Sequence, residues 1–238
     1  MENWQEDLLS ASLNAKDTDQ LFDIAKSISA QLGYGYCAYG MHIPLSIAQP
    51  KTILLNNYPE EWQQRYAERH YIAIDPTVRH CLNSLKPLIW TSQTANKQLP
   101  RDFWDEAQSY GLNVGWSQSC RDLIGTQGML TLARSADPIS EQEQKSQSTK
   151  IFWLAQMLHN SIAKIVNDKE CAVLNLKLST REKEVLRWSA EGKTSSEIAL
   201  ILSISERTVT FHVVNAMQKL NVNNKISAVI RAVMLGLL

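Results

Sequence analysis

Residues 178–220 read LSTREKEVLRWSAEGKTSSEIALILSISERTVTFHVVNAMQKL, and this stretch decides the fold of the C-terminal part of the chain. Two capping boxes lie in it: Ser179 precedes Glu182 by three residues, and Thr194 precedes Glu197 by three. In such a box the hydroxyl and the carboxylate each accept from a backbone N–H that a new helix leaves without a partner. The pattern therefore predicts two helices, which begin after Ser179 and after Thr194.

A short turn and a third helix follow. Gly192 is a typical residue for the end of the first helix. The residues Ser-Ile-Ser at 203–205 predict a tight turn after the second helix, and Ser205 can cap a third helix that runs to about Leu220. Two helices joined by such a turn are typical of a helix-turn-helix unit, whose second helix enters the major groove of DNA.

The third helix of this stretch has two distinct faces. An apolar stripe at helical spacing predicts a core-facing side, formed by Val209, Val213, Ala216, Met217 and Leu220. The opposite side carries Arg207, Thr210, Phe211, Val214 and Gln218. An outward Phe and Val are unusual on a solvated helix, but in a major groove they can contact thymine methyl groups. The alternative is a small helical bundle with a few exposed apolar residues.

Roles on DNA can be assigned to these side chains as hypotheses. We expect Arg207, Thr210 and Phe211 to read bases, with Val214 on the same face. We expect Lys193, Thr194 and Lys219 to bind phosphate, and the flank formed by Thr208, His212 and Asn215 to hydrogen-bond phosphates as well. Phosphate contacts set the register of a protein on DNA rather than its sequence preference.

This C-terminal part closely resembles the DNA-binding domain of LuxR-type quorum-sensing regulators. The matching positions are Glu182, Leu186, Gly192, Thr194, Ile198, Ala199, Thr208, Val209, His212, Asn215, Lys219, Leu220 and Lys225. The resemblance implies a fourth helix, for which Asn224 to Leu235 fits, with Ile226, Val229, Ile230 and Val233 inward. It also implies that this last helix pairs across a dimer on DNA.

Charge is distributed unevenly, although the formal net charge of the 238 residues is +0. From Asn175 to the end, nine Lys and Arg stand against five Asp and Glu, whereas the preceding part has fifteen against nineteen. A basic C-terminal part beside an acidic N-terminal part fits a DNA-binding module attached to a separate sensor.

Cysteine usage and the N-terminus indicate the compartment. Cys37, Cys81, Cys120 and Cys171 are far apart and form no C-x-x-C pair, so we expect reduced, buried thiols rather than a zinc or redox site. No apolar run approaches the roughly 20 residues of a membrane span, and the acidic N-terminus is not typical of a signal peptide. We expect a soluble cytoplasmic protein with no metal and no cofactor.

The first 166 residues mix helices and strands without regular βαβ alternation. Periodicity, caps and prolines predict helices at 4–13, 17–32, 59–69, 75–84, 100–110 and 140–166, and strands at 34–42, 52–56, 87–90, 114–121 and 128–134. We therefore predict an α+β protein: an N-terminal α/β/α sandwich with an antiparallel sheet, followed by the four-helix helix-turn-helix domain. The expected domains are 1–166 and 177–238, joined by a charged linker at 167–176. The apolar stripe of the helix at 140–166 packs either on the sheet or on a second subunit.

Aromatic residues and one carboxylate are concentrated in the middle of the N-terminal part. They are Tyr58, Trp62, Tyr66, Asp75, Trp90, Phe103 and Trp104. An apolar, aromatic cluster with few polar groups is what a buried small-molecule pocket requires. Such clusters more often form an aromatic core, in which Asp75 would only cap the helix that begins at Pro76. Spacing alone leaves both interpretations open.

The N-terminal part resembles the acyl-homoserine lactone-binding domain of the same family, from about residue 21 to residue 134. The signature positions are Trp62, Tyr66, Asp75, Pro76, Trp90 and Gly115. The resemblance implies that Trp62 donates its indole N–H to the lactone carbonyl and that Asp75 accepts from the amide N–H. It implies that Tyr58 and Thr131 hold the amide carbonyl or a nearby acyl oxygen. Ring and chain would be surrounded by Tyr66, Val78, Trp90, Phe103, Leu112, Ala38 and Gly40.

The two resemblances together predict a ligand-dependent transcriptional regulator and not an enzyme. The expected effector is an N-acyl-homoserine lactone autoinducer, and the expected partners are double-stranded DNA with an inverted repeat, a second copy of the chain, and RNA polymerase. We expect an activator without a membrane partner. The sequence leaves open the acyl-chain length, its oxidation at the third carbon, and a regulator that answers another small molecule or represses.

Two other classes of protein fit the sequence less well. A two-component response regulator needs a phosphoacceptor Asp on a doubly wound parallel sheet, but Asp17 and Asp19 precede a helix rather than following a strand. A metal-dependent lactone hydrolase needs clustered ligands, and the five histidines form no such cluster in the sequence. Cys81, next to His80, is more typical of a core residue than of a nucleophile.

Overall fold

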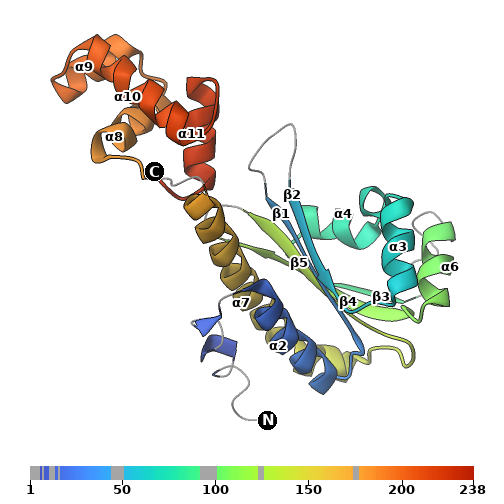
Figure 1. The fold of residues 1–238 in the computed structure, drawn as a ribbon. Helices are drawn as coiled ribbons and strands as arrows, with labels where there is room; N and C mark the ends of the chain where they lie inside the picture. The colour runs from blue at the N-terminus through green and yellow to red at the C-terminus, as the bar shows by residue number, and fades with distance from the viewer. Residues whose placement is uncertain are drawn as a thin grey trace. The chain divides into compact units, whose positions relative to one another are not determined.

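The computed structural model describes residues 6, 8–10, 14–15, 17–43, 51–91, 101–122, 126–173 and 177–238 (Figure 1). The described residues form two compact units, one up to Ile165 and one from Val166 to Leu238. Most of the helix predicted at 4–13 lies outside the described residues. Within this range the structure describes residues 6 and 8–10, and these are helical.

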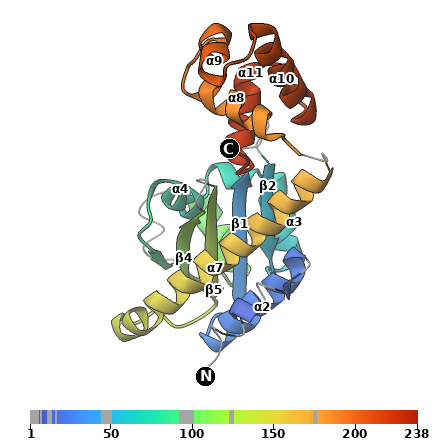
Figure 2. The ribbon, with the colours of Figure 1, turned by 90° about the vertical axis from the view of Figure 1, so that its left-hand side faces the viewer.

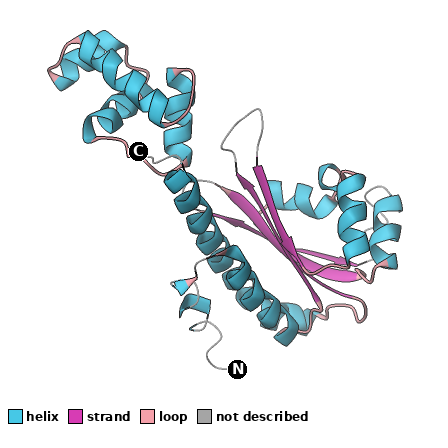
Figure 3. Cartoon of the chain, in the orientation of Figure 1, coloured by secondary structure: helices cyan, strands magenta, loops and turns pink. Residues whose placement is uncertain are grey.

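The first unit is built on a five-stranded sheet in the order β2-β1-β5-β4-β3, with every neighbouring pair antiparallel. The strands are β1 (Tyr36–Ile43), β2 (Lys51–Asn56), β3 (Leu88–Thr91), β4 (Val114–Arg121) and β5 (Gln127–Arg134). One face is covered by α2 (Thr18–Gln31) and α7 (Glu141–Val173), and the other by α3 (Glu60–Glu68), α4 (Pro76–Asn83) and α6 (Arg101–Ser109) (Figures 1 and 3). The predicted α+β sandwich with an antiparallel sheet is confirmed.

Some short features of this unit differ from the sequence prediction, among them β1, which was predicted at 34–42 and is found at Tyr36–Ile43. A 3-10 helix, η1 (Tyr71–Ala73), lies between α3 and α4 and was not predicted, because a single turn has no periodicity to detect. The strand predicted at 87–90 is β3, shifted by one residue to Leu88–Thr91. The first residue of the helix predicted at 100–110 lies outside the described residues, and α6 begins at Arg101.

Helix α7 runs diagonally across the sheet (Figure 2), and its apolar stripe is buried within the chain. Ile151, Leu154, Leu158 and Ile162 are each 0% exposed, so of the two alternatives the stripe packs on the sheet. The helix continues to Val173, beyond the predicted end at 166. The charged residues after 166 include neither Gly nor Pro, so nothing in this segment stops a helix whose outer side meets water. Residues 174–176 of the predicted linker lie outside the described residues.

The second unit contains α8 (Thr180–Ala190), α9 (Ser195–Leu202), α10 (Glu206–Lys219) and α11 (Lys225–Met234). Both predicted capping boxes are formed, with the hydroxyls of Ser179 and Thr194 at the starts of α8 and α9. Ser203 takes the left-handed conformation, with φ 54°, at the turn between α9 and α10. Ser205 then accepts from the backbone N–H of Thr208 and begins α10. The predicted helix-turn-helix is confirmed.

The orientation predicted for the last helix is wrong at two positions. Ile226 and Val233, expected inward, are 70% and 47% exposed. The buried residues of α11 are instead Ala228 and Ala232, each 0% exposed, which pack with Leu235 in the core of this unit. Small side chains let the backbone of α11 approach its neighbours closely, and Ile226 and Val233 are turned outward. Val229 is partly buried against the same core.

Candidate functional site

A cavity of about 670 Å³ lies between the sheet and helices α3, α4 and α6. Residues of β1, β2 and β5 line one side, and residues of α3, η1, α4, β3 and α6 line the rest. Its wall is mainly apolar and aromatic, with a few polar groups. Pockets that bury small molecules have this composition, and their volumes are about 300–1,000 Å³.

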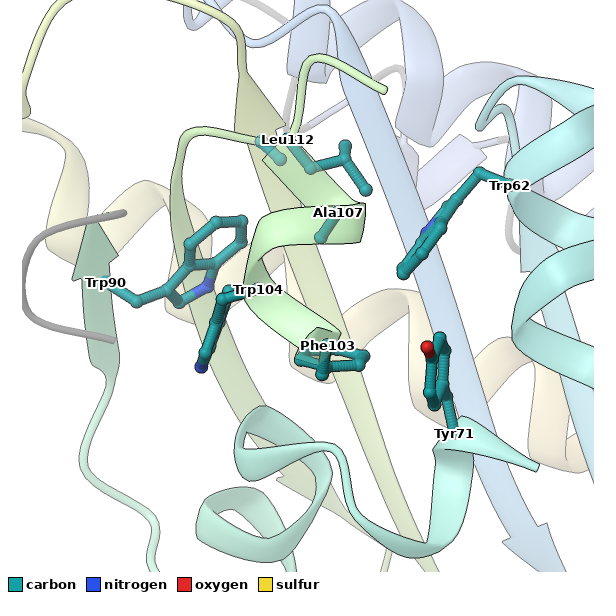
Figure 4. Packing of buried hydrophobic residues seen from close by; sticks show 8 residues of the cluster. Trp62, Tyr71, Trp90, Phe103, Trp104, Ala107 and Leu112 are labelled. Atoms are coloured by element: carbon teal, nitrogen blue, oxygen red, sulfur yellow. The ribbon is translucent and has the colours of Figure 1, made fainter. Parts of the chain in front are cut away.

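Every residue predicted to contact a ligand lies on the wall of this cavity. They are Ala38, Gly40, Tyr58, Trp62, Tyr66, Asp75, Val78, Trp90, Phe103, Leu112 and Thr131. The aromatic rings also pack on one another: Trp62 lies 5.9 Å from Phe103 and Trp90 lies 5.2 Å from Trp104, centroid to centroid. Figure 4 shows Trp62 and Tyr71 across from Trp90 and Trp104, with Phe103 and Ala107 of α6 between them. The cluster is therefore both an aromatic core and the wall of a cavity.

Asp75 holds the start of α4 and faces the cavity at the same time. Its Oδ1 accepts from the backbone N–H and the hydroxyl of Thr77, at 2.8 and 2.7 Å, and its Oδ2 accepts from the hydroxyl of Tyr66 at 2.9 Å. Asp75 as a whole residue is 9% exposed. Burial raises the pKa of Asp75 above its ordinary value, although the hydrogen bonds from Thr77 and Tyr66 act in the opposite direction.

Trp62 on α3 and Tyr58, which precedes that helix, each bring a hydrogen-bond donor to the wall. Trp104 of α6 also lines the cavity, and its buried Nε1 has no hydrogen-bond partner among the described residues. Trp62 is 2% exposed. Burial, with Asp75 nearby, raises the pKa of Tyr58, so its hydroxyl keeps its proton at neutral pH. These groups, with the carboxylate of Asp75, offer donors and an acceptor to a bound molecule.

Thr131 reaches the cavity from β5 and belongs to a hydrogen-bonded chain across the sheet. Trp90 donates from Nε1 to Oγ of Ser117 at 3.1 Å, and Oγ of Ser117 lies 3.0 Å from Oγ1 of Thr131. Ser117 is fully buried and was not predicted. The available signal was strand alternation, because Ser117 follows Gly115 by two residues and therefore shares its side of β4.

Several residues on the wall itself were also missed. They are Met41, His42, Thr52, Leu54, Asn56, Gln63, Ala67, His70, Ile72, Thr77, Cys81, Leu82, Ala107, Gln127, Gly128 and Met129. Some could have been found by period-two alternation, since His42 follows Ala38 and Gly40 on one side of β1. Those of η1 and α4 could not, because their direction depends on how these short elements pack.

An ion pair ties together the helices on either side of the aromatic cluster. Arg65 of α3 donates through Nε and Nη2 to both carboxylate oxygens of Glu106 of α6, at 2.7 and 2.9 Å. The hydrogen bonds from Arg65 lower the pKa of Glu106 to about 2. Because α3 carries Trp62 and α6 carries Phe103, this pair holds two walls of the cavity together.

In the described part of the chain the cysteines are free thiols, and the possible metal ligands form no metal site. Cys37, Cys81 and Cys120 are free and buried, and burial raises the pKa of the Cys37 and Cys81 thiols to about 12. No group of three or more His, Cys, Asp or Glu among the described residues is placed to hold a metal ion. The side chain of Cys171 lies outside the described residues.

None of the described helices is long and apolar enough to cross a membrane.

The outer face of α10 has the mixed character that the sequence predicted. Val209, Ala216 and Leu220 are 0% exposed and form the inner side. On the outer side Phe211 is 60% exposed and Val214 is 42% exposed, and Arg207, Thr210 and Gln218 are exposed as well. The predicted flank of Thr208, His212 and Asn215 is half-buried.

The predicted phosphate-binding residues already have partners within the fold. The ammonium of Lys219 lies 2.7 and 2.9 Å from the two carboxylate oxygens of Glu182. Lys193 lies 3.9 Å from Glu197, with both side chains well exposed. Thr194 caps α9, and its hydroxyl also donates to Glu197. Contact of these three residues with phosphate stays a prediction.

Comparison with known families identifies both units. Residues 17–162 match the model of the autoinducer binding domain, and residues 176–232 match that of bacterial regulatory proteins of the luxR family. The chain belongs to the LuxR family of transcriptional regulators. It is therefore a DNA-binding regulator with an autoinducer-type ligand domain, and not an enzyme.

Similar proteins cover the whole length of this LuxR-family chain. The transcriptional activator protein AnoR of Acinetobacter nosocomialis is 66% identical over 238 residues, 100% of each chain. The HTH-type quorum-sensing regulator RhlR of Pseudomonas aeruginosa is 32% identical, over 99% of this chain and 96% of RhlR. A crystal structure of Escherichia coli SdiA superposes with a TM-score of 0.83 at 31% identity, over 99% of this chain and 98% of SdiA.

Proposed function

We propose that this LuxR-family protein senses an N-acyl-homoserine lactone and, when it is bound, activates transcription as a homodimer at an inverted-repeat DNA element. The observation that carries the proposal is the cavity between the sheet and α3, α4 and α6, in which the polar groups of Tyr58, Trp62, Asp75 and Thr131 meet a mainly apolar wall. A neutral amphiphile with one polar end and one apolar chain matches this distribution. We place the protein in the cytoplasm, with RNA polymerase as a further partner.

The polar cluster suits the head of such a lactone. Asp75 accepts from the ligand amide N–H, Trp62 donates to the lactone carbonyl, and Tyr58 and Thr131 hold the amide carbonyl or a nearby acyl oxygen. Support comes from the position of Trp62, Tyr58 and Thr131 on the wall of the cavity and from the buried Asp75 on the same wall. A polar ligand group that enters such a site without a partner costs about 1–3 kcal/mol, so these few contacts select the head group.

The apolar wall suits an acyl chain. Gly40, Val78, Phe103 and Leu112 are among its members, and each methylene that leaves water there contributes about 0.8 kcal/mol. A solved structure of SdiA in complex with octanoyl-rac-glycerol is similar to this chain, with a TM-score of 0.76 at 30% identity over 98% of it. That relative binds a molecule with an eight-carbon acyl chain and a neutral polar head, which supports an amphiphile in this cavity.

Ligand binding would act on DNA binding through stability. A molecule that binds only the folded state stabilises it by RT ln(1 + [L]/Kd), about 2.7 kcal/mol at a hundredfold excess over Kd. We propose that the lactone completes the interior of residues 1–166 and thereby raises the concentration of paired DNA-binding domains at 177–238, with 167–176 as the linker. The 66% identity to the activator AnoR supports activation.

A second copy of the chain would pair through α11 on DNA. Ile226 and Val233 lie on its outer side, 70% and 47% exposed, seven residues apart and therefore on one helix face. An apolar face of this kind supports the proposed pairing. In a two-fold dimer the α10 helices would then reach two half-sites about one turn of DNA apart.

The proposal is tested by the thermal stability of the full chain with a panel of N-acyl-homoserine lactones of different chain length. We expect at least one lactone to raise the melting temperature and the Asp75→Ala variant to lose this rise. Asp17→Ala is the matched control, because Asp17 caps α2 in the same manner, away from the cavity. It should lower stability by about 1 kcal/mol and keep the lactone effect. If no lactone stabilises the wild-type chain, the proposal is wrong.

A further inference from the structure

Ser117 is not among the residues that line the cavity, yet it joins two residues that are. It lies on β4 opposite Thr131 of β5, as its cross-strand partner, and is 0% exposed. Its Oγ lies 3.1 Å from Nε1 of Trp90 and 3.0 Å from Oγ1 of Thr131. Trp90 and Thr131 both face the cavity. Ser117 therefore contacts two wall residues, Trp90 and Thr131, without lining the cavity itself.

This contact depends on a glycine next to Trp90. Gly115 is the cross-strand partner of Trp90, and a Cβ on Gly115 would lie 2.2 Å from Cζ2 of the indole. Because glycine has no side chain, the indole can lie directly against β4 at Gly115. Its N–H then reaches Ser117, the next residue on the same side of the strand.

The directions of the two hydrogen bonds follow from where each proton can go. An indole nitrogen only donates, so Ser117 accepts from Trp90. The hydroxyl of Ser117 has one proton, and within the described residues Thr131 is the remaining partner of that hydroxyl. If Thr131 donated to Ser117, the proton of Ser117 would be buried without an acceptor, which is unfavourable. Trp90 therefore donates to Ser117, and Ser117 donates to Thr131. The hydroxyl proton of Thr131 then remains available to another acceptor.

We propose that Ser117 is a positioning residue, which fixes the hydroxyl of Thr131 as a donor toward the cavity. The wall at Thr131 then selects a ligand oxygen that accepts a hydrogen bond, such as an amide carbonyl or a carbonyl at the third carbon of an acyl chain. A ligand N–H at this point meets an oxygen that already accepts from Ser117. The identity of the ligand rests on the proposed function, whereas the direction of the hydrogen bonds does not.

A double-mutant cycle on the full chain tests this role. The probe is N-(3-oxododecanoyl)-homoserine lactone, which carries both kinds of carbonyl oxygen, and the readout is its dissociation constant by calorimetry. We expect Ser117→Ala to weaken binding roughly five- to tenfold, and Thr131→Val to weaken it at least as much. In the Thr131→Val background we expect Ser117→Ala to have almost no further effect, because Ser117 acts through the Thr131 hydroxyl.

Ser119 provides a matched control for the loss of a buried serine hydroxyl. It follows Ser117 on the same side of β4, is 2% exposed, and donates to the carbonyl oxygen of Ser84 at 2.7 Å. Ser119→Ala should have the same small effect on lactone binding with and without Thr131→Val. Ser117→Thr keeps the hydroxyl and should restore affinity. If Ser117→Ala does not fold, Ser117→Cys, with its weaker donor, replaces it in the cycle.

The outcomes separate this inference from the proposed function. If the wild-type chain binds the lactone but Ser117→Ala and Thr131→Val reduce affinity independently, Ser117 is only structural and the inference is wrong. The inference is also wrong if Ser117→Ala leaves the affinity unchanged. If neither this probe nor any other lactone binds the wild-type chain, both the inference and the proposed function fail.

Discussion

The ammonium of Lys219 lies 2.7 and 2.9 Å from the two carboxylate oxygens of Glu182, a residue that is only 3% exposed. Glu182 also accepts from the backbone N–H of Ser179, at the start of α8. These hydrogen bonds lower the pKa of Glu182 although burial acts in the opposite direction. Lys219 near the end of α10 is therefore joined to the first turn of α8, and it has a role in the fold whatever it does on DNA.

We expect Lys219→Met to destabilise the second unit. It would leave the Glu182 carboxylate buried without its cation, at a cost of about 2 kcal/mol, and amide exchange in α8 and α10 should accelerate by roughly thirtyfold. Hydrogen exchange followed by mass spectrometry measures this. Lys193→Met is the control, since Lys193 lies 3.9 Å from an exposed Glu197 and its loss should change little. Unchanged protection in the Lys219 variant would contradict the structural role.

The predicted phosphate contact of Lys219 has its own measurement. If Lys219 also binds phosphate, Lys219→Gln should reduce the slope of log affinity against log salt by about one. DNA binding of the full chain at several salt concentrations gives this slope. An unchanged slope would mean that the ammonium serves Glu182 alone.

The affinity for a lactone should depend on pH through Asp75. Its pKa is raised in the folded state, so protonation of this carboxyl favours the fold: that contribution is complete below the ordinary value of 3.8 and is lost as pH rises through the folded-state pKa. A ligand N–H that donates to the carboxylate favours the ionised form. Lactone affinity should therefore decline as pH falls from about 7 toward the raised pKa of Asp75.

Titration calorimetry at several pH values, on the wild type and on Asp75→Asn, isolates this effect. His42 and His70 also line the cavity, and the Asn variant retains both. The pKa of Glu106 is lowered to about 2, so that group stays ionised over the range. An identical pH profile in the two proteins would argue against an interaction between the ligand amide and Asp75.

Gly115→Ala should disturb the cavity from inside the sheet. The added Cβ would lie 2.2 Å from the ring of Trp90 and 2.8 Å from the carbonyl oxygen of Leu132, so the indole must move. We expect a loss of about 1–3 kcal/mol in stability and a weaker lactone effect on the melting temperature. Gly35→Ala is the control, because a Cβ there meets nothing within 4 Å. A variant with wild-type melting and lactone response would show that Trp90 relocates without consequence.

Phe211 should make DNA binding sensitive to thymine methyl groups. Replacing thymine by uracil removes only the methyl group, and each methyl that contacts the exposed ring should contribute roughly fourfold in affinity. A duplex selected from a random pool with the full chain, and then resynthesised with uracil at each thymine in turn, supplies the probe. Phe211→Ala should abolish the methyl effect, whereas Leu200→Ala, at an 82% exposed position of α9, should keep it. Equal methyl effects in wild type and Phe211→Ala would refute direct contact.

The elements that the sequence predicted well are those whose signals are local. In the capping boxes at Ser179 and Thr194 the hydrogen-bond partner lies three residues further along the sequence, and both boxes form as predicted. The stripe of Val209 and Ala216 likewise needs only the helical period to place it inward. Composition and turns predicted the five strands, but local signals carry no information about the order of strands in a sheet.

The features that were missed depend on packing between distant segments. Ile226 and Val233 have the spacing of a buried stripe, but the smaller Ala228 and Ala232 allow a closer approach and take the inner side. Ser117 is an ordinary serine in the sequence, and it acquires a role only because Trp90 crosses Gly115 to meet it. The candidate ligand residues came from the family resemblance, since aromatic spacing alone is more often a sign of a solid core.

Asp75 begins helix α4 with one carboxylate oxygen, accepts from Tyr66 with the other, and lines the cavity. A single side chain thus serves the architecture of the domain and the choice of signal. A lineage that exchanged this aspartate to recognise a different head group would also have to supply a new beginning for α4. A change in the recognised signal is therefore easier along its tail, because wall residues such as Val78 and Phe103 lie inside helices and begin none.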